Sequence, residues 1–443
     1  IIAFNIHICA FFARVRDEAL AQKDTLLDSN DAEEEVTIAH MEHDEEEDGE
    51  VPPEVPAEEE RPAPQRQPKI SNGVSDGEAE AGFPIMAARA STYVPPPLSL
   101  LGKNKGKPEV GDVKANMNLI KRTLQNFGIQ VEMDEVSIGP SITRYALKTA
   151  DGIKISRIVA LQNDISLALA AHPIRIETPI PGKSLVGIEI PNNTKTIVGL
   201  ASLLSSEEYQ KSEKSLLVAL GKSVTGKSYF GNISKMPHML IAGATVSGKS
   251  VTIHNILTSL LYRNSPENLQ LILIDPKRVE LTLYNKIPHL LTPVITDAKK
   301  AILSLKWATK EMDRRYDILE AEAVRDIESY HKNIFNRQKI KEERRIKGGE
   351  EEFEDAVETM PFIVIIIDEL ADIMSIYPRE LEGAIIRLAQ MSRAVGIHLV
   401  LSTQRPSVNI ITGLIKANIP SRIAMQVASQ IDSRTILDMA GAE

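Results

Sequence analysis

The sequence predicts an α/β fold with a mostly parallel sheet in its C-terminal half. Short, continuous apolar runs recur after about residue 215, and longer helical stretches separate them. Strands that are apolar on both faces and alternate with helices are typical of a parallel sheet covered by helices on both sides. The expected strands are Met239–Ala242, Leu271–Ile274, Phe362–Ile367 and His398–Leu401. We place this domain at residues 201–443.

A smaller α+β subdomain is expected in front of it, at residues 110–200. Apolar residues at helical spacing are followed by strand-like segments on either side of Gly139-Pro140, a turn signal. The expected elements are a helix at 115–127, strands at 131–136, 141–147, 174–177 and 185–190, and an amphipathic segment at 153–169. This subdomain carries no catalytic constellation of its own.

Residues 17–109 are expected to be a disordered linker, first acidic and then rich in proline. Such a composition buries too little apolar surface to offset the entropy lost on ordering. Residues 1–60 carry 19 acidic and 3 basic side chains, a net charge of −16 within the chain's total of −10. The remainder is therefore mildly basic, at +6, which is weak support for a polyanionic partner.

The first 16 residues are apolar but too short to span a bilayer alone. Three interpretations stay open: the end of a transmembrane helix whose start is missing, a shifted start of the sequence, or a buried helix. No small-residue cleavage site follows, so the segment does not read as a signal peptide. The chain has one cysteine, Cys9, which excludes an internal disulfide and fits a reducing compartment.

The main chemical motif lies between the first apolar strand and an amphipathic helix. Its eight residues match G-x-x-x-x-G-K-[ST], the P-loop pattern, in which backbone N–H groups at a helix N-terminus surround a phosphate. These residues are Gly243, Ala244, Thr245, Val246, Ser247, Gly248, Lys249 and Ser250. We expect ATP to bind here, with Lys249 on the β- and γ-phosphates and Ser250 as a ligand of Mg²⁺.

One residue of the motif is unusual. Val246 occupies a position where many P-loops have glycine, and a β-branched side chain is costly if that position requires a positive φ. Either the loop tolerates this residue or nucleotide binding is weakened.

A second motif supports the first. The apolar strand Phe362–Ile367 ends in Asp368 and Glu369. We expect Asp368 to hold Mg²⁺ through water and Glu369 to act as the base that polarises the attacking water. Asp275, at the end of another apolar strand, is a rival acid, but no glutamate follows it. Choosing Asp368–Glu369 predicts one extra strand between the P-loop strand and the acid strand.

Two further residues are candidates for catalysis. Thr403 and Gln404 lie at the end of the apolar strand expected at His398–Leu401, and a polar pair at a strand end beside the nucleotide, with Gln404 as the sensor, is suited to detecting the γ-phosphate. Arg393 precedes that strand, and an arginine can stabilise transition-state charge from a neighbouring subunit. The alternatives are a polar strand end for Gln404 and an ordinary surface arginine for Arg393.

These residues lie within a sequence that resembles the motor domain of the FtsK/SpoIIIE DNA translocases. The resemblance covers about residues 110–443. The matching strings include MPHMLIAGATVSGKSV, LILIDPKRVEL, EMDRRY, IIIDELADIM and RLAQMSRAVGIHLVLSTQRPSVNIITGLIKANIPSRIA, with GPSITRYAL and IPGKSLVGIEIPN in the smaller subdomain.

The resemblance implies a RecA-like P-loop NTPase that forms hexameric rings around double-stranded DNA and pumps it during chromosome segregation at division or sporulation. By position, Lys249 and Ser250 become the Walker A pair, Asp368 and Glu369 the Walker B pair, Arg393 the arginine finger in trans and Gln404 the sensor. Family members also carry an N-terminal membrane domain and a C-terminal winged-helix module. We therefore expect a fragment of a protein anchored in the bacterial inner membrane, with its motor in the cytoplasm.

Two alternatives to DNA translocation stay open at this point: a related ring ATPase for conjugation or protein secretion, and a membrane-tethered scaffold with an inactive site. The residues that contact DNA are not evident from the sequence, because phosphate contacts look like any surface charge. The candidates are Lys277, Arg278, Arg405 and Lys416.

Overall fold

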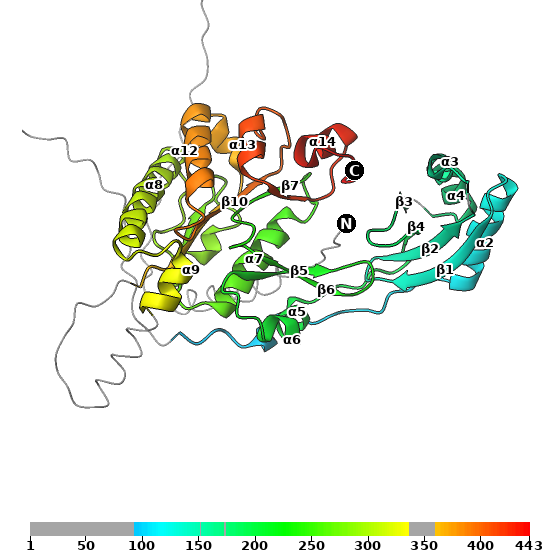
Figure 1. Ribbon diagram of the computed structural model, residues 1–443, viewed down its shortest axis with the longest axis horizontal. Coiled ribbons are helices and arrows are strands. Elements are labelled where there is room, and N and C mark those ends of the chain that lie inside the picture. Colours follow the sequence, from blue (N-terminus) through cyan, green and yellow to red (C-terminus); the bar gives the residue numbers. More distant parts are fainter. Residues whose placement is uncertain (1–92, 151, 172–173, 336–358) are drawn as a thin grey trace, which may run out of the picture. The chain divides into compact units, whose positions relative to one another are not determined.

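The computed structural model describes residues 93–150, 152–171, 174–335 and 359–443 (Figure 1). The predictions for residues 1–16 and for the linker as far as residue 92 lie outside these residues. In the described part of the chain, no helix is both long and apolar enough to cross a membrane.

The smaller subdomain is built on a four-stranded antiparallel sheet in the order β1-β2-β4-β3. Its strands are β1 (Val131–Ile138), β2 (Ile142–Thr149), β3 (Arg175–Glu177) and β4 (Val186–Pro191), and its helices are α2 (Val113–Asn126), α3 (Ile155–Ala160) and α4 (Gln162–Ala168). Asp112 caps α2 by accepting a hydrogen bond from the backbone of Ala115. The amphipathic segment expected at 153–169 is thus divided into two short helices.

The larger domain is built on a five-stranded parallel sheet in the order β11-β7-β10-β9-β8. Its strands are β7 (His238–Ala242), β8 (Leu269–Ile274), β9 (Phe362–Ile367), β10 (Ile397–Thr403) and β11 (Ser421–Ala424). The four apolar runs of the sequence become β7 to β10, and every residue of β7, β9 and β10 is buried. The expected parallel α/β fold is confirmed.

The strand order confirms a more specific prediction. Strand β10 lies between the P-loop strand β7 and the acid strand β9. Because all five strands run in the same direction, the residues that follow β7, β9 and β10 meet at one edge of the sheet. We call this the carboxyl edge, and the opposite one the amino edge.

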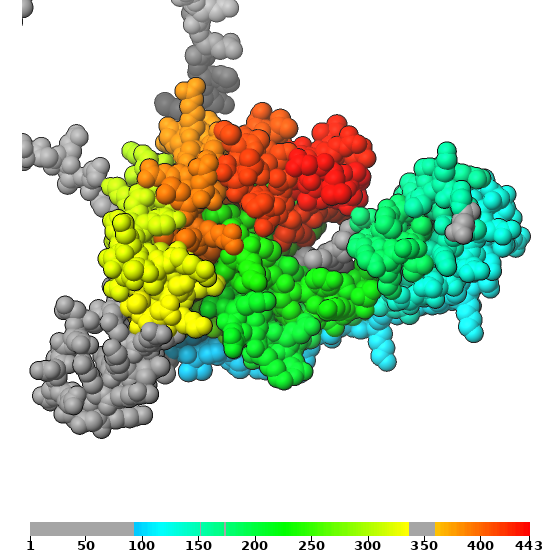
Figure 2. Space-filling view, viewed as in Figure 1, coloured from blue at the N-terminus to red at the C-terminus, as the bar shows by residue number. Residues whose placement is uncertain are grey.

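Helices cover the sheet on both sides (Figure 1). Helix α7 (Lys249–Arg263) packs against a separate hairpin of β5 (Leu217–Lys222) and β6 (Ser228–Asn232). The remaining helices are α5 (Leu200–Leu204), α6 (Glu207–Gln210), α8 (Ala298–Ala321), α9 (Ile327–Tyr330), α11 (Leu370–Met374), α12 (Pro378–Met391), α13 (Gly413–Asn418) and α14 (Gln430–Leu437). Helices α12, α13 and α14 form the orange-to-red surface of Figure 2.

Two features differ from the sequence prediction. Strand β11 was not expected, because its residues Ser421–Ala424 are polar or only half-buried at the edge of the sheet. Residues 93–109 were assigned to the linker, but they contain the 3₁₀ helix Leu98–Leu100 and backbone bridges from Lys105 to Ile197 and from Glu109 to Thr194. Part of the segment predicted to be linker is therefore ordered.

Candidate active site

The P-loop joins β7 to α7 at the carboxyl edge, and its two glycines are required for different reasons. A Cβ on Gly243 would lie 2.5 Å from Cβ of Met425 and 2.7 Å from Oγ of Ser247. Gly248 has φ +99°, a left-handed conformation that glycine adopts without strain, and it immediately precedes α7. The loop is also tied to its neighbours, because N–H of Ala244 donates to the carbonyl of Gln426 at 3.0 Å.

Val246 is strained, as the sequence suggested it would be if this position needed a positive φ. Its φ is +68°, and its side chain is 99% exposed. The left-handed conformation costs an L-residue roughly 1–2 kcal/mol, and an exposed side chain makes no packing contact that offsets this cost. The P-loop therefore keeps its turn at the expense of backbone strain.

The loop has the features of a phosphate site. Oγ of Ser247 is buried and has no hydrogen-bond partner among the described residues. An orphaned hydroxyl at the start of a 15-residue helix, beside a left-handed glycine, is suited to an anionic oxygen. The residues present thus fit the phosphate groups of a nucleotide.

Lys249 and Asp368 form a buried ion pair beside this loop. Nζ of Lys249 lies 2.7 Å from Oδ1 of Asp368 and also donates to its carbonyl oxygen at 2.8 Å. Only 3% and 1% of the two side chains are exposed. Burial raises the pKa of Asp368 although Lys249 lowers it, and the charges of Asp275 and Glu280 raise it further. This carboxylate therefore needs an adjacent cation to remain ionised.

Glu369, the next residue, is fully buried and accepts several hydrogen bonds. Its Oε1 accepts from Oγ1 of Thr403 at 2.7 Å, and both carboxylate oxygens lie 3.2 Å from N–H of Gln404. Its Oε2 lies 3.1 Å from Nζ of Lys277. Burial raises the pKa of Glu369, but the hydrogen bonds from Thr403 and Lys277 outweigh it and hold the pKa below its usual value.

The loop that follows β8 contacts Glu369 through Lys277 and helix α7 through Glu280. Oδ2 of Asp275 accepts hydrogen bonds from the backbone of Glu280 at 3.0 Å and of Leu281 at 2.9 Å, so Asp275 closes the loop. Hydrogen bonds from His254 and Ser250 lower the pKa of Glu280, although burial raises it. Asp275, the rival acid of the sequence analysis, thus closes this loop beside the site.

The same residues fit Mg²⁺ as part of a nucleotide complex. The described residues contain no group of three or more His, Cys, Asp or Glu side chains placed to hold a metal. Mg²⁺ is usually held by only one or two protein ligands together with substrate phosphates and water. Ser250 and Asp368 are suited to that role, and when bound the ion would neutralise charge on the phosphates.

The structure brings most of the proposed site residues together but separates Arg393 from them. The P-loop, Asp368, Glu369 and Gln404 meet at the carboxyl edge, and Gln404 reaches Glu369 through its backbone N–H. Arg393 is exposed in the connection before β10, at the amino edge. The seven residues of β10 separate the edges by about 20 Å, at about 3.3 Å per residue. Arg393 thus has no access to the site of its own subunit.

Sequence analysis missed three functional contacts. Thr403 appeared there only as part of a strand end, Lys277 only as a DNA-contact candidate, and Glu280 not at all. Lys416, another DNA candidate, pairs with Asp438 at 2.7 Å, whereas Arg278 and Arg405 are exposed. Lys277 follows β8, which pairs with β9, so a correct strand order would have predicted its contact with Glu369.

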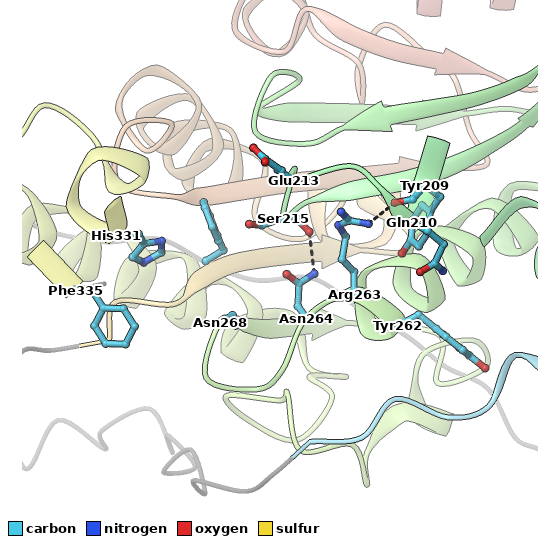
Figure 3. A pocket seen from close by; sticks show the side chains of 11 residues that line it. Tyr209, Gln210, Glu213, Ser215, Tyr262, Arg263, Asn264, Asn268, His331 and Phe335 are labelled. Carbon is cyan, nitrogen blue, oxygen red and sulfur yellow. Dashed lines mark hydrogen bonds between the residues drawn. The ribbon is translucent and has the colours of Figure 1, made fainter. Parts of the chain in front are cut away.

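A cavity of about 520 Å³ lies at the amino edge (Figure 3). Its lining includes Asn268, which precedes β8, and Phe362, which begins β9. The polar groups of Arg263 and Asn264 that line it already donate to the backbone carbonyls of Tyr209 and Ser215, at 2.8 and 3.0 Å. This cavity is therefore separate from the phosphate site.

Comparisons with known proteins place the chain in a family. A family model described as "FtsK/SpoIIIE family" matches residues 199–408, and one described as "FtsK alpha domain" matches residues 95–192. A protein named DNA translocase FtsK from Caldanaerobacter subterraneus subsp. tengcongensis is 52% identical over 353 residues, which cover 79% of this chain and 47% of that protein. The chain belongs to the FtsK/SpoIIIE family.

Other relatives give the same FtsK assignment. DNA translocase FtsK from Clostridium tetani is 49% identical over 83% of this chain and 48% of its own length. The chain thus spans about half the length of the curated relatives that it matches. Among solved structures, the conjugation coupling protein TcpA of pCW3, with ATPγS, is 25% identical over 73% of this chain and 87% of its own, with a TM-score of 0.46.

Proposed function

We propose that this chain is the motor part of an ATP-driven translocase of double-stranded DNA that acts in chromosome segregation at cell division or sporulation. The observation that carries the proposal is the meeting of the P-loop with Asp368, Glu369 and Gln404 at one edge of a parallel sheet. The sequence identity to proteins named DNA translocase FtsK supports DNA as the substrate.

Each residue of the site has its own role in phosphoryl transfer. The P-loop amides bind the phosphates, and Lys249 exchanges Asp368 for the β- and γ-phosphates when ATP enters. Asp368, together with Ser250, would then be able to hold Mg²⁺, which would neutralise charge on the phosphates. Glu369 accepts the proton of the attacking water, and Gln404, which follows β10, reports on the γ-phosphate.

The position of Arg393 supports action between subunits. An exposed arginine about 20 Å from the site of its own chain can reach a nucleotide only if a second copy presents its amino edge to that nucleotide. We therefore propose a ring of six copies, with an anchor in the bacterial inner membrane supplied by a region beyond the described residues.

The test is ATP hydrolysis by the 443-residue chain with and without duplex DNA. Duplex DNA is expected to stimulate hydrolysis, and the stimulation is expected to fall steeply with salt, because phosphate contacts release counterions. Lys249→Ala is expected to abolish hydrolysis, whereas Lys299→Ala, which removes an exposed lysine of α8, is the matched control. Displacement of a triplex-forming oligonucleotide along the duplex would measure translocation directly.

Hydrolysis at the full rate without DNA, together with no affinity for duplex DNA at low salt, would contradict the proposal. Removing Lys249 leaves Asp368 buried without its partner, so that variant also needs a check of its folding by circular dichroism. Arg393→Ala gives a second test. It should abolish hydrolysis alone, but mixing it with Lys249→Ala should restore some activity, because mixed rings contain complete interfaces.

A further inference from the structure

The two acids that follow β9 are each held by a lysine. Asp368 pairs with Lys249 at 2.7 Å, and Glu369 pairs with Lys277 at 3.1 Å. Both carboxylates are buried, but the lysines differ: Lys249 is 3% exposed and Lys277 is 34% exposed. Lys249 exchanges its partner for a phosphate of ATP in the proposed mechanism. Lys277 is the more exposed of the two lysines, and its described partner is Glu369.

With all of its present hydrogen bonds in place, the carboxylate of Glu369 is a poor general base. Its carboxylate accepts hydrogen bonds from Thr403, Gln404 and Lys277, and at 3.4 Å from N–H of Ala371, where it caps α11. Every donor to the ionised form makes the carboxylate less basic and occupies a lone pair that the attacking water needs. Of these donors, only Lys277 contributes a full charge and only Lys277 is substantially exposed to solvent.

The loop that carries Lys277 is short, closed and strained. Asp275 accepts hydrogen bonds from Glu280 and Leu281, and N–H of Arg278 donates to the carbonyl of Asp275 at 3.2 Å. Arg278 has φ +60°, a conformation that costs a non-glycine residue roughly 1–2 kcal/mol and that persists only where surrounding contacts impose it. The loop tip thus has a fixed position, with Lys277 directed to Glu369.

The same tip faces solvent with a second cation. Arg278 is exposed, Val279 is 65% exposed, and no ion pair is described for the side chain of Arg278. Two adjacent cations on an exposed loop are suited to a backbone phosphate of DNA, which offers Lys277 an alternative partner to Glu369.

We propose that Lys277 is a positioning residue that restrains Glu369, and that a phosphate of duplex DNA at the tip of the loop draws Lys277 away and frees the base. This proposal rests on the proposed function. In the freed state, the oxygen of water bonds to the γ-phosphorus, the bond to the β–γ bridging oxygen breaks, and the water's proton moves to Glu369. ADP and phosphate are the products. DNA binding is thereby coupled to hydrolysis through one side chain.

The experiment compares three variants of the full chain with the parent. Lys277→Met keeps the length of the side chain but removes its charge, and Lys277→Arg keeps the charge. Lys286→Met is the control. Lys286 is an exposed lysine of the same connection for which no side-chain contact is described. Lys277→Met is expected to raise the DNA-free rate roughly tenfold, the size of one charge-assisted hydrogen bond, and to reduce stimulation by DNA. Lys277→Arg should restore the parent's behaviour, and Lys286→Met should match the parent.

The split between kcat and KM distinguishes restraint from a merely structural role. Without DNA, Lys277→Met is expected to raise kcat and to leave the KM for ATP unchanged, because the described contact of Lys277 is with Glu369. A DNA-free kcat that falls, or a KM that changes as much as kcat, would overturn the proposal, because Lys277 would then serve catalysis, nucleotide binding or stability directly.

A second measurement separates this proposal from the proposed function. If the parent hydrolyses no ATP with or without DNA, the proposed function fails, and the carboxyl ¹³C resonance of Glu369 still reports whether Lys277 contacts it. Lys277→Met, and duplex DNA added to the parent, should each shift that resonance in the same direction. An unchanged resonance in both cases overturns the restraint.

Discussion

The carboxyl and amino edges of the five-stranded sheet both bury titratable side chains. The acids at the carboxyl edge are paired with cations, whereas the histidines at the amino edge are neutral. At the carboxyl edge Asp368 and Glu369 are buried beside cations. At the amino edge His238 and His398 are buried on adjacent strands, and burial is the main cause that lowers their pKa values to about 4 and about 3. The carboxyl edge thus holds buried, ionised acids, whereas His238 and His398 at the amino edge are buried in the neutral form.

Backbone strain does not separate the two edges in the same way. Val246 and Arg278, both at the carboxyl edge, have positive φ values of 68° and 60°, and Met360, which precedes β9 at the amino edge, has a φ of 34°. At the amino edge Arg315 is buried and pairs with Glu311 at 2.8 Å. The buried acids of the carboxyl edge pair instead with lysines beside the P-loop, where perturbed pKa values are typical of a functional site.

The largest effect should come from removing the base at the carboxyl edge. Glu369→Gln is expected to lower kcat by roughly 10²–10⁴-fold, the usual contribution of a positioned base, while leaving ATP binding intact. The amide oxygen can still accept from Thr403 and Gln404, so the loss reflects chemistry more than folding. Single-turnover hydrolysis and binding of a fluorescent nucleotide measure the two properties separately.

The matched control lies at the amino edge. His331→Gln alters a half-buried side chain whose Nε2 contacts the carbonyl of Met360 at 2.9 Å, a contact that an amide can replace. It should leave kcat unchanged. Equal losses of kcat in the two variants would show that the edges do not differ in function.

The next effect is the dependence of stability on pH. His238 and His398 have folded pKa values below the usual 6.5, so the unfolded chain binds more protons than the folded chain between about pH 6.5 and pH 4. The free energy of unfolding should therefore fall as the pH falls through this window, by about 1.4 kcal/mol per pH unit for each histidine. Denaturant titrations followed by the fluorescence of Trp307 measure it.

The carboxyl edge provides the contrast. The folded pKa of Glu369 is below its usual 4.5, so the stability that it contributes is present above that pH and is lost below it. The double variant His238→Gln/His398→Gln should reduce the slope of the free energy of unfolding against pH between pH 4 and 6.5. Glu369→Gln should leave that slope unchanged. His289 and His331 also have lowered pKa values and leave a residual slope in the double variant. A slope unaltered by the histidine substitutions would contradict neutral burial.

The smallest effect should come from relieving strain in the P-loop. Val246→Gly removes a left-handed strain of roughly 1–2 kcal/mol but adds about 0.5–1 kcal/mol of unfolded-chain entropy, so a net stabilisation between about zero and about 1.5 kcal/mol is expected. Val246→Ala, which keeps Cβ and removes the branch, is the matched control and should stabilise less. Nucleotide affinity should rise with Gly. A destabilising Val246→Gly would indicate that the valine has a compensating contact.

Local patterns in the sequence predicted much of the fold. The apolar runs became β7 to β10, the motif around Lys249 became a loop and helix, and the acids after β9 were placed beside it. These features depend on residues close in the chain, through backbone conformation, helix periodicity and apolar alternation. Strand β11 was missed because an edge strand buries too little to need a continuous apolar run.

By itself, the sequence determined the phosphate loop, the acids and the expectation of a strand between them. Only the tertiary structure decided that Lys277 meets Glu369, 92 residues away, that Thr403 donates to the same carboxylate, and that Arg393 lies at the opposite edge. The physical reason is that strand order, rather than distance along the chain, brings side chains together. A lysine that faces only solvent and one that pairs with a buried carboxylate have the same sequence pattern, and only the structure shows that the partner of Lys277 is buried.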